Sequence, residues 1–212
     1  MKIPQNKHPL IMGIINLTPD SFYSHNQNDK SKIFDELEYQ YADIIDFGCE
    51  SSRPGANPVS EKNELLRLSK FLDKGHHLPN MLSIDTYKPV VAKFALENGF
   101  NMINDIKAGG ENDLMLKLAA EYDCPIVLMH MKGVPATMQD NPYCDDIMSD
   151  IISFFEMKLK IAESLGIKRN NLILDPGIGF GKRREDNNVI LDNLDTLKQF
   201  NHPILIGLSR KS

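Results

Sequence analysis

The strongest constraint on the fold is a regular alternation of short apolar runs with longer segments of helical periodicity. The runs are rich in Ile, Leu and Val without strict polar alternation, which is typical of parallel strands covered on both faces. We predict strands at residues 10–17, 43–48, 81–85, 101–106, 125–130, 172–175 and 203–208. The intervening segments predict helices at residues 31–41, 60–74, 88–98, 112–122, 145–165 and 188–200.

Repeated strand–helix units are compatible with an open doubly wound sheet or with a (β/α)8 barrel. The G-x-G-x-x-G loop of a doubly wound dinucleotide-binding sheet does not follow the first predicted strand. Polar residues instead follow nearly every strand, as the active face of a barrel requires. We therefore predict one α/β domain over residues 1–212, a TIM (β/α)8-type barrel truncated after strand 7, without its last strand and last two helices.

Composition limits the partners that we expect. A net charge of -5 gives no long-range attraction to nucleic acid or to an anionic membrane. No apolar stretch is long enough to span a bilayer, and no signal-peptide cleavage site follows the first apolar run. Three widely spaced cysteines without a C-x-x-C pair indicate structural thiols in a reducing compartment, so we expect a cytoplasmic protein.

Three polar residues, Asp85, Asn104 and Asp175, lie nearest to predicted strand ends, and we expect them to share the mouth of the barrel. A buried carboxylate is costly unless it meets hydrogen-bond donors. Two carboxylates and one amide around a shared cavity suit a flat heterocycle that bears several N–H groups. Each hydrogen bond to a charged group would contribute roughly 1.5–3 kcal/mol.

Further polar residues lie on the predicted loops, and they suit an anion. They are Asn16, Ser51, Ser52, Arg53 and Lys211. Arg53 can hold a phosphate or carboxylate with two parallel hydrogen bonds. Glycines in DPGIGFGK and RPGA permit close approach of the backbone to a ligand. The sequence therefore predicts a heterocycle pocket with an anion-binding rim.

Seven ordered segments resemble the signatures of the dihydropteroate synthase family of pterin-binding barrels. They are MGIINLTPDSFYS, ESSRPGA, SIDTYKP, NDI, MHMKGVPATMQ, DPGIGFGK and SRKS. The resemblance implies a transferase that condenses 4-aminobenzoate with (7,8-dihydropterin-6-yl)methyl diphosphate, giving 7,8-dihydropteroate and diphosphate in folate biosynthesis. It also implies bound Mg²⁺, a sulfonamide target and a homodimer.

The resemblance also implies a role for each matching residue. The pterin-binding set is Asp85, Asn104, Ile106, Met129, Asp175 and Lys211. The set for aminobenzoate and diphosphate is Phe22, Ser52, Arg53, Pro54, Phe180 and Ser212, and Asn16 is the residue at the diphosphate and its metal ion. The catalytic set is Asp85, Asp175, Lys211, Arg53 and Asn16. In this family diphosphate departs first, a negatively lined pocket favours the pterin methylene cation, and the aniline nitrogen then attacks.

The chain departs from the family pattern at several places. Cys49 stands where glycine is usual, and Ser52 stands where threonine is usual, so the affinity for aminobenzoate is expected to differ. The first loop reads FYSHNQND instead of an FSDGG-like stretch. The Arg and His of the family's last strand have no counterpart, which is why we expect a truncated barrel.

Structural interpretations compete with several of these assignments. Asp85 and Asp175 can be helix N-caps beside Pro89 and Pro176, and Arg53 can be a surface ion pair. Four further expectations concern residues outside the site. They are a solvated basic turn at Lys182, Arg183 and Arg184, a hydrogen-bonded wall residue at His130, a packing thiol at Cys49, and helix core at Phe154, Phe155 and Met157. No spacing of His, Cys or carboxylates suggests structural zinc.

Two other functions are compatible with a barrel of this kind. One is a pterin-binding methyltransferase, whose barrel resembles this one at the pterin trio but needs neither TPDSF nor SSRPG. The other is a non-catalytic pterin-binding relative, because the first loop is altered. Release of diphosphate that depends on aminobenzoate separates the synthase from both.

Overall fold

The computed structural model describes residues 9–17, 41–50, 58–73, 80–133, 137–138 and 142–207 of the 212-residue chain. The strands are β1 (Met12–Asn16), β2 (Ile44–Gly48), β3 (Met81–Asp85), β4 (Met102–Asp105), β5 (Ile126–Met129) and β6 (Leu172–Asp175). The α-helices are α3 (Glu61–Leu72), α4 (Pro89–Glu97), α5 (Leu114–Glu121), α6 (Ile147–Ser164) and α7 (Arg184–Asp192). Short 3-10 helices are η1 (Glu111–Asp113), η2 (Arg169–Asn171) and η3 (Leu194–Phe200).

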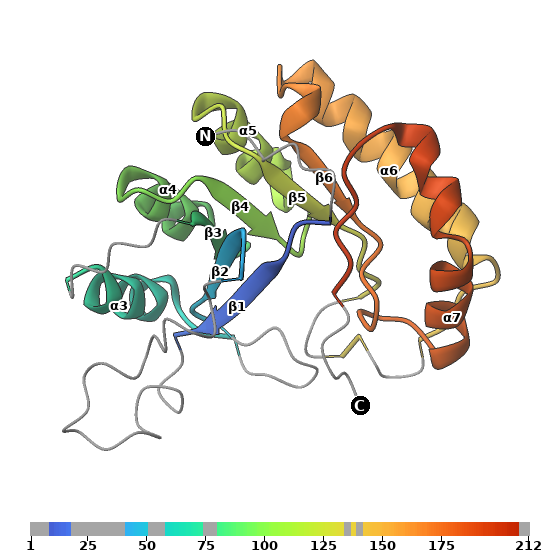
Figure 1. Cartoon of the computed structure of the whole chain (residues 1–212), viewed down its shortest axis with the longest axis horizontal. Helices are drawn as coiled ribbons and strands as arrows, with labels where there is room; N and C mark the ends of the chain where they lie inside the picture. Colours follow the sequence, from blue (N-terminus) through green and yellow to red (C-terminus); the bar gives the residue numbers. More distant parts are fainter. Residues whose placement is uncertain are drawn as a thin grey trace.

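The six strands form one parallel sheet in the order β1-β2-β3-β4-β5-β6. A doubly wound sheet reverses its strand order and places helices on both faces. Here the order never reverses, and helices α3 to α7 follow one another around the outside of a curved sheet (Figure 1). This is the architecture of a (β/α)8-type barrel, so the predicted fold class is confirmed.

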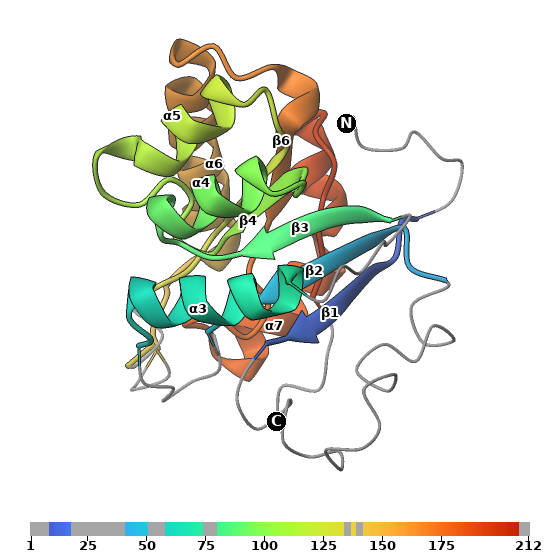
Figure 2. The same ribbon diagram turned by 90° about the vertical axis from the view of Figure 1, so that its left-hand side faces the viewer.

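The outer face of the sheet packs against the helices and carries most of the hydrophobic core. Figure 2 shows α3 and α4 lying along the strands on this side. Phe47 of β2 contacts Phe71 of α3 and Phe100, with ring centroids 4.6 and 5.4 Å apart. Phe155 of α6 is fully buried in the same cluster. Each such side chain contributes on the order of 2 kcal/mol by burial.

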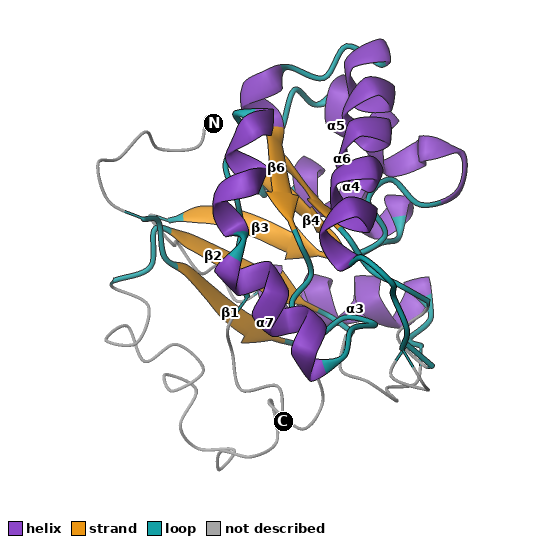
Figure 3. Ribbon diagram, turned by 90° about the vertical axis from the view of Figure 1, so that its right-hand side faces the viewer, coloured by secondary structure: helices purple, strands orange, loops and turns teal. Residues whose placement is uncertain are grey.

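The inner face of the sheet is lined in levels by every second residue of each strand, because strand side chains alternate between faces. An apolar cluster on this face comprises Ile44, Met81, Met102, Val127 and Ile173. On β1 to β4 the residues of this face become polar toward the carboxyl ends of the strands. Figure 3 shows the edge of the sheet at which these ends meet.

The predicted strands are largely confirmed. Six are present, and β3 and β6 have the predicted bounds. The seventh, predicted at 203–208, is a single parallel bridge between Leu174 and Ile204 within the described residues. Its hydrogen bonds run from Leu174 N to Pro203 O, at 2.9 Å, and from Leu205 N to Leu174 O, at 2.8 Å.

The helices begin and end for identifiable local reasons. Ser60, the N-cap of α3, accepts a hydrogen bond from Asn63 N at 3.4 Å, and α4 begins with Pro89. The helix predicted at 188–200 begins earlier, at Arg184, because the Asp186 carboxylate accepts from Arg183 N at 2.9 Å and caps an additional turn. The helix predicted at 31–41 lies outside the described residues, apart from Tyr41 in a turn.

One core prediction in α6 is wrong. Phe155 is buried, but Met157 is 50% exposed, because it lies two positions further around the helix.

Among the described residues, no helix is both long enough and apolar enough to cross a membrane.

Candidate active site

Four residues share one level of the inner face where the first four strands end. The register pairs Asn16 with Gly48, Gly48 with Asp85, and Asp85 with Asn104. A Cβ atom on Gly48 would lie 3.3 Å from Asn16 Oδ1 and 3.5 Å from Asp85 Oδ2. The absence of a side chain at Gly48 therefore lets those of Asn16 and Asp85 converge above it.

A second level lies one step nearer the mouth. Asn104 is at the level of Ile173, so Asp175 lies on the same face and two residues further on. Asp175 pairs in register with Met129. Five of the residues predicted to bind pterin are described, four of them on two adjacent levels of the inner face and Ile106 in the turn after β4, whereas Lys211 lies outside the described residues. The five are Asp85, Asn104, Ile106, Met129 and Asp175.

An apolar wall adjoins these polar groups. Ile106, Met129 and Phe180 pack together with Met138, and all four are buried. Tyr87 and Met131 pack against them and are partly exposed. The predicted residues Ile106, Met129 and Phe180 are therefore brought together. Met138 was missed because the sequence around it carries no periodic signal.

Asp46 is a further polar residue of the inner face that sequence reasoning missed. It is 3% exposed, and its Oδ2 accepts a hydrogen bond from Asn104 Nδ2 at 2.8 Å. Asp46 Oδ1 and Ser83 Oγ have no hydrogen-bond partner among the described residues. A carboxylate within the apolar run ADIIDF was the available signal. Asp46 thereby holds the Asn104 amide from below.

The carboxyl groups of the site are buried close to one another, which disfavours their charged forms in the absence of a ligand. Burial raises the pKa of Asp85 well above its ordinary value, and the neighbouring Asp46 and Asp105 raise it further. Burial also raises the pKa of Asp46, although the hydrogen bond from Asn104 counteracts this. Such carboxylates are stabilised by a ligand that brings N–H groups or positive charge.

Asp105 lies on the opposite face of β4 from Asn104, and its carboxylate supports a loop. Its two oxygens accept from Lys107 N, at 2.8 Å, and from Gly109 N, at 2.7 Å. Burial raises its pKa to about 6. The side chain fixes the turn that follows Ile106.

The N-cap interpretation is wrong for both predicted carboxylates. Helix α4 is capped at Lys88 and α7 at Arg183, so neither begins at Asp85 or Asp175. Asp175 Oδ1 instead accepts from Gly177 N at 2.6 Å, and Asp175 O accepts from His130 N at 2.8 Å. Asp175 is thus held by its own loop and by the end of β5.

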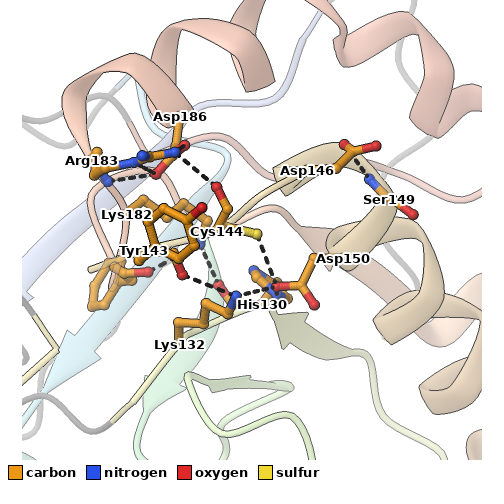
Figure 4. Close-up of polar contacts among 11 residues, drawn as sticks. His130, Lys132, Tyr143, Cys144, Asp146, Ser149, Asp150, Lys182, Arg183 and Asp186 are labelled. Carbon is orange, nitrogen blue, oxygen red and sulfur yellow. Dashed lines mark hydrogen bonds and ion pairs between the residues drawn. The ribbon is translucent and has the colours of Figure 1, made fainter. Parts of the chain in front are cut away.

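The predicted solvated turn at 182–184 is wrong at its first residue. Lys182 is only 2% exposed, and its Nζ donates to His130 O at 2.9 Å, Gly177 O at 2.8 Å and Phe180 O at 3.0 Å. Figure 4 shows Lys182 next to His130. The ammonium is buried because three backbone carbonyls replace its water.

Arg183 is also engaged, although it is partly exposed. It binds both oxygens of Asp186 and donates to Cys144 O at 2.9 Å (Figure 4). The start of α7 is thereby joined to the loop after β5.

His130 is buried, as predicted, but its imidazole ring makes few polar contacts. Its Nε2 lies 3.5 Å from Asp150 Oδ2, and its Nδ1 has no hydrogen-bond partner among the described residues. Its ring meets Phe154 edge-on, with centroids 5.1 Å apart. Burial and the nearby Lys182 lower the pKa of His130 to about 4, so the imidazole is neutral at pH 7.

A charged network lies at the base of the loop after β2. The Lys88 ammonium bonds to both Glu50 and Glu64. Glu50 also accepts from Tyr87 Oη at 3.0 Å and from Val59 N at 3.1 Å. Cys49, fully buried beside it, has a thiol pKa raised by burial to about 12, in agreement with a packing role.

Six predicted site residues lie outside the described part of the chain. They are Phe22, Ser52, Arg53, Pro54, Lys211 and Ser212. Within the described ranges, no group of three His, Cys, Asp or Glu side chains is arranged to hold a metal ion. Asn16, predicted to lie at Mg²⁺, is an exposed amide at the mouth, beside Asp85.

Comparison with known proteins identifies relatives over nearly the whole chain. The family model described as "Pterin binding enzyme" matches residues 12–212. The dihydropteroate synthase of Haemophilus influenzae is 41% identical over 209 residues, which cover 96% of this chain and 76% of the relative. That of Clostridium beijerinckii is 43% identical over 209 residues, covering 95% and 74%.

Solved structures give the same result. A Yersinia pestis dihydropteroate synthase in complex with a sulfonamide drug has a TM-score of 0.86 and 38% identity, covering 100% of this chain and 80% of that one. A Xanthomonas albilineans dihydropteroate synthase with 4-aminobenzoic acid has a TM-score of 0.81 and 35% identity, covering 97% and 74%.

Proposed function

Since this chain belongs to the pterin-binding enzyme family, we propose that it catalyses the dihydropteroate synthase reaction. The substrates are 4-aminobenzoate and (7,8-dihydropterin-6-yl)methyl diphosphate, and the products are 7,8-dihydropteroate and diphosphate. The observation that carries this proposal is the gathering of Asp85, Asn104 and Asp175 on one face, next to an apolar wall.

The pocket chemistry suits the pterin ring. The ring has amino and N–H groups along one edge, and Asp85, Asn104 and Asp175 offer oxygens to them. Ile106 and Met129 supply apolar surface for the ring faces. Each hydrogen bond to a carboxylate would contribute roughly 1.5–3 kcal/mol. A ring without these donors would leave buried carboxylates unpaired and be rejected.

The same carboxylates would assist the chemical step. As the C–O bond to diphosphate breaks, its electron pair leaves with the diphosphate and positive charge develops on the pterin methylene. Asp85, Asp46 and Asp175 surround the ring with negative charge, which stabilises that cation. The aniline nitrogen of aminobenzoate then forms the C–N bond and loses a proton.

The rim would bind the anionic groups. We assign the diphosphate and aminobenzoate to Asn16, Phe180 and the residues predicted from the resemblance, which are Phe22, Ser52, Arg53, Pro54, Lys211 and Ser212. Mg²⁺ binds proteins through few oxygens and commonly retains substrate phosphates as ligands, so the Asn16 amide oxygen suits it. When bound, Mg²⁺ would neutralise the departing diphosphate.

We further propose a transferase that acts as a cytoplasmic homodimer on small molecules. The family resemblance supports the dimer. The thiols Cys49, Cys124 and Cys144 are all free and buried, which supports a reducing compartment.

A direct assay tests the proposed function. Diphosphate release from the dihydropterin substrate is measured with and without 4-aminobenzoate, in the presence of Mg²⁺. Release that depends on aminobenzoate, with dihydropteroate as product, is expected. Binding of the pterin without turnover would instead indicate the non-catalytic relative.

A further inference from the structure

Lys182 occupies an unusual position for a lysine. Its side chain is almost completely buried, although lysine is among the residues least often found inside proteins. Its ammonium donates to the carbonyls of His130, Gly177 and Phe180, at 2.8 to 3.0 Å. Removing water from an ammonium group is costly. Here the three backbone carbonyls replace that water, so the ammonium and the carbonyls hold one another in place.

The three carbonyls belong to segments that form the site. Gly177 N donates to the Asp175 carboxylate, so the peptide groups on both sides of Gly177 are held, one by Asp175 and one by Lys182. His130 N donates to Asp175 O, and His130 O accepts from Lys182. Phe180, whose carbonyl is the third partner, forms part of the apolar wall.

The loop after β6 packs closely against the backbone at the end of β5, with no room for a side chain at Gly177. A Cβ atom on Gly177 would lie 2.1 Å from His130 O and 3.1 Å from Lys182 Nζ. The backbone at Gly177 also has a φ of +68°, which favours glycine. The loop after β6 therefore touches the end of β5 at the point where the ammonium binds.

We propose that Lys182 is a positioning residue, which holds Asp175 and Phe180 in place for the pterin by joining the backbone carbonyls of His130, Gly177 and Phe180. This inference deepens the proposed function and rests on it. Lys182 does not contact substrate; it acts through the backbone that carries the two residues.

The test compares a variant at Lys182 with a destabilised control. Lys182→Met keeps an unbranched side chain, one atom shorter, and removes the donors. Leu118→Ala removes a buried side chain from α5, in the outer core, and serves as a destabilised control. Binding of (7,8-dihydropterin-6-yl)methyl diphosphate is measured by titration calorimetry, and melting temperature by circular dichroism.

We expect Lys182→Met to weaken pterin binding by roughly tenfold or more, because displacement of site groups by about 1 Å has effects of that order. Leu118→Ala, with a comparable loss of melting temperature, should bind the pterin as the unmodified chain does. Equal affinity of Lys182→Met and the unmodified chain would overturn the inference alone. Absence of pterin binding by the unmodified chain would overturn the proposed function as well.

A second variant covers the case in which Lys182→Met does not fold. Lys182→Arg keeps the positive charge and hydrogen-bond donors, but a planar guanidinium cannot place one nitrogen among three carbonyls. We expect this variant to fold and to bind the pterin several-fold more weakly. Unchanged affinity would contradict a positioning role.

Discussion

At the scale of single residues, Asp175 combines a structural contact with the proposed recognition of the pterin. Its Oδ1 accepts from Gly177 N. The variant Asp175→Asn can keep this bond through its own carbonyl oxygen, but it places an NH2 group where the second carboxylate oxygen lies. The fold should therefore survive while the site loses charge.

We expect Asp175→Asn to weaken pterin binding about ten- to a hundredfold, which corresponds to the loss of one charged hydrogen bond. Titration with the dihydropterin substrate measures the affinity, and thermal unfolding measures the fold. An affinity equal to that of the unmodified chain, at an equal melting temperature, would refute the assignment of Asp175.

The sequence was informative about residues that follow strand ends and poor at those inside elements or loops. Asp85, Asn104 and Asp175 could be predicted because parallel strands bring their carboxyl ends to one edge. Asp46 lies within a strand buried on both faces, where the sequence has no period that tells inside from outside. Lys182 depends on three backbone carbonyls, which no residue pattern reports.

At the scale of elements, the network around Lys88 joins three parts of the chain. Glu50 follows β2, Glu64 lies on the first turn of α3, and Lys88 caps α4. Glu64 is 1% exposed and also accepts from Thr86 Oγ1 at 3.1 Å. One ammonium group thus pairs with two carboxylates. Without it, the buried negative charge of Glu64 would be unfavourable.

The variant Lys88→Met should lower the free energy of unfolding by about 3 kcal/mol at pH 7, because it leaves a buried carboxylate unpaired. Lys93→Met, on an exposed position of the same helix, is the control and should change stability by less than about 0.5 kcal/mol. Denaturant titrations measure both. Similar losses in the two variants would show that the network contributes nothing specific.

The bounds of the strands could be predicted closely because turn residues flank each apolar run. The first residues of the helices were harder to predict. The start of α7 depends on a reciprocal contact between Asp186 and Arg183. The charged segment RRED is equally compatible with a solvated turn, so the sequence does not predict this contact.

At the scale of the whole molecule, two buried groups give opposite dependences of stability on pH. His130 has its pKa lowered from 6.5 to about 4, so the folded protein binds fewer protons than the unfolded chain between those values. Its contribution is present above pH 6.5 and is lost as the pH falls. Asp105 has its pKa raised from 3.8 to about 6, and its contribution is lost as the pH rises.

We predict that His130→Gln removes the first dependence. The stability difference between the unmodified chain and this variant should then grow by about 3 kcal/mol as the pH is raised from about 4 to about 6.5. Urea unfolding at several pH values measures it. Curves for the two proteins that stay parallel across this range would contradict the neutral, buried imidazole.

The bond from Asn104 Nδ2 to Asp46 Oδ2 decides which way round the amide sits. Because the NH2 group of Asn104 points toward Asp46, its carbonyl oxygen is left for the ligand. The site then offers the ligand oxygen atoms from Asn104 and from the carboxyl groups of Asp85 and Asp175. A lumazine carries a carbonyl in place of the pterin's amino group, so its oxygen would face the Asn104 oxygen and it would bind weakly. Asp46→Ala would allow the amide to rotate, and the protein would then discriminate less between pterin and lumazine in competition binding.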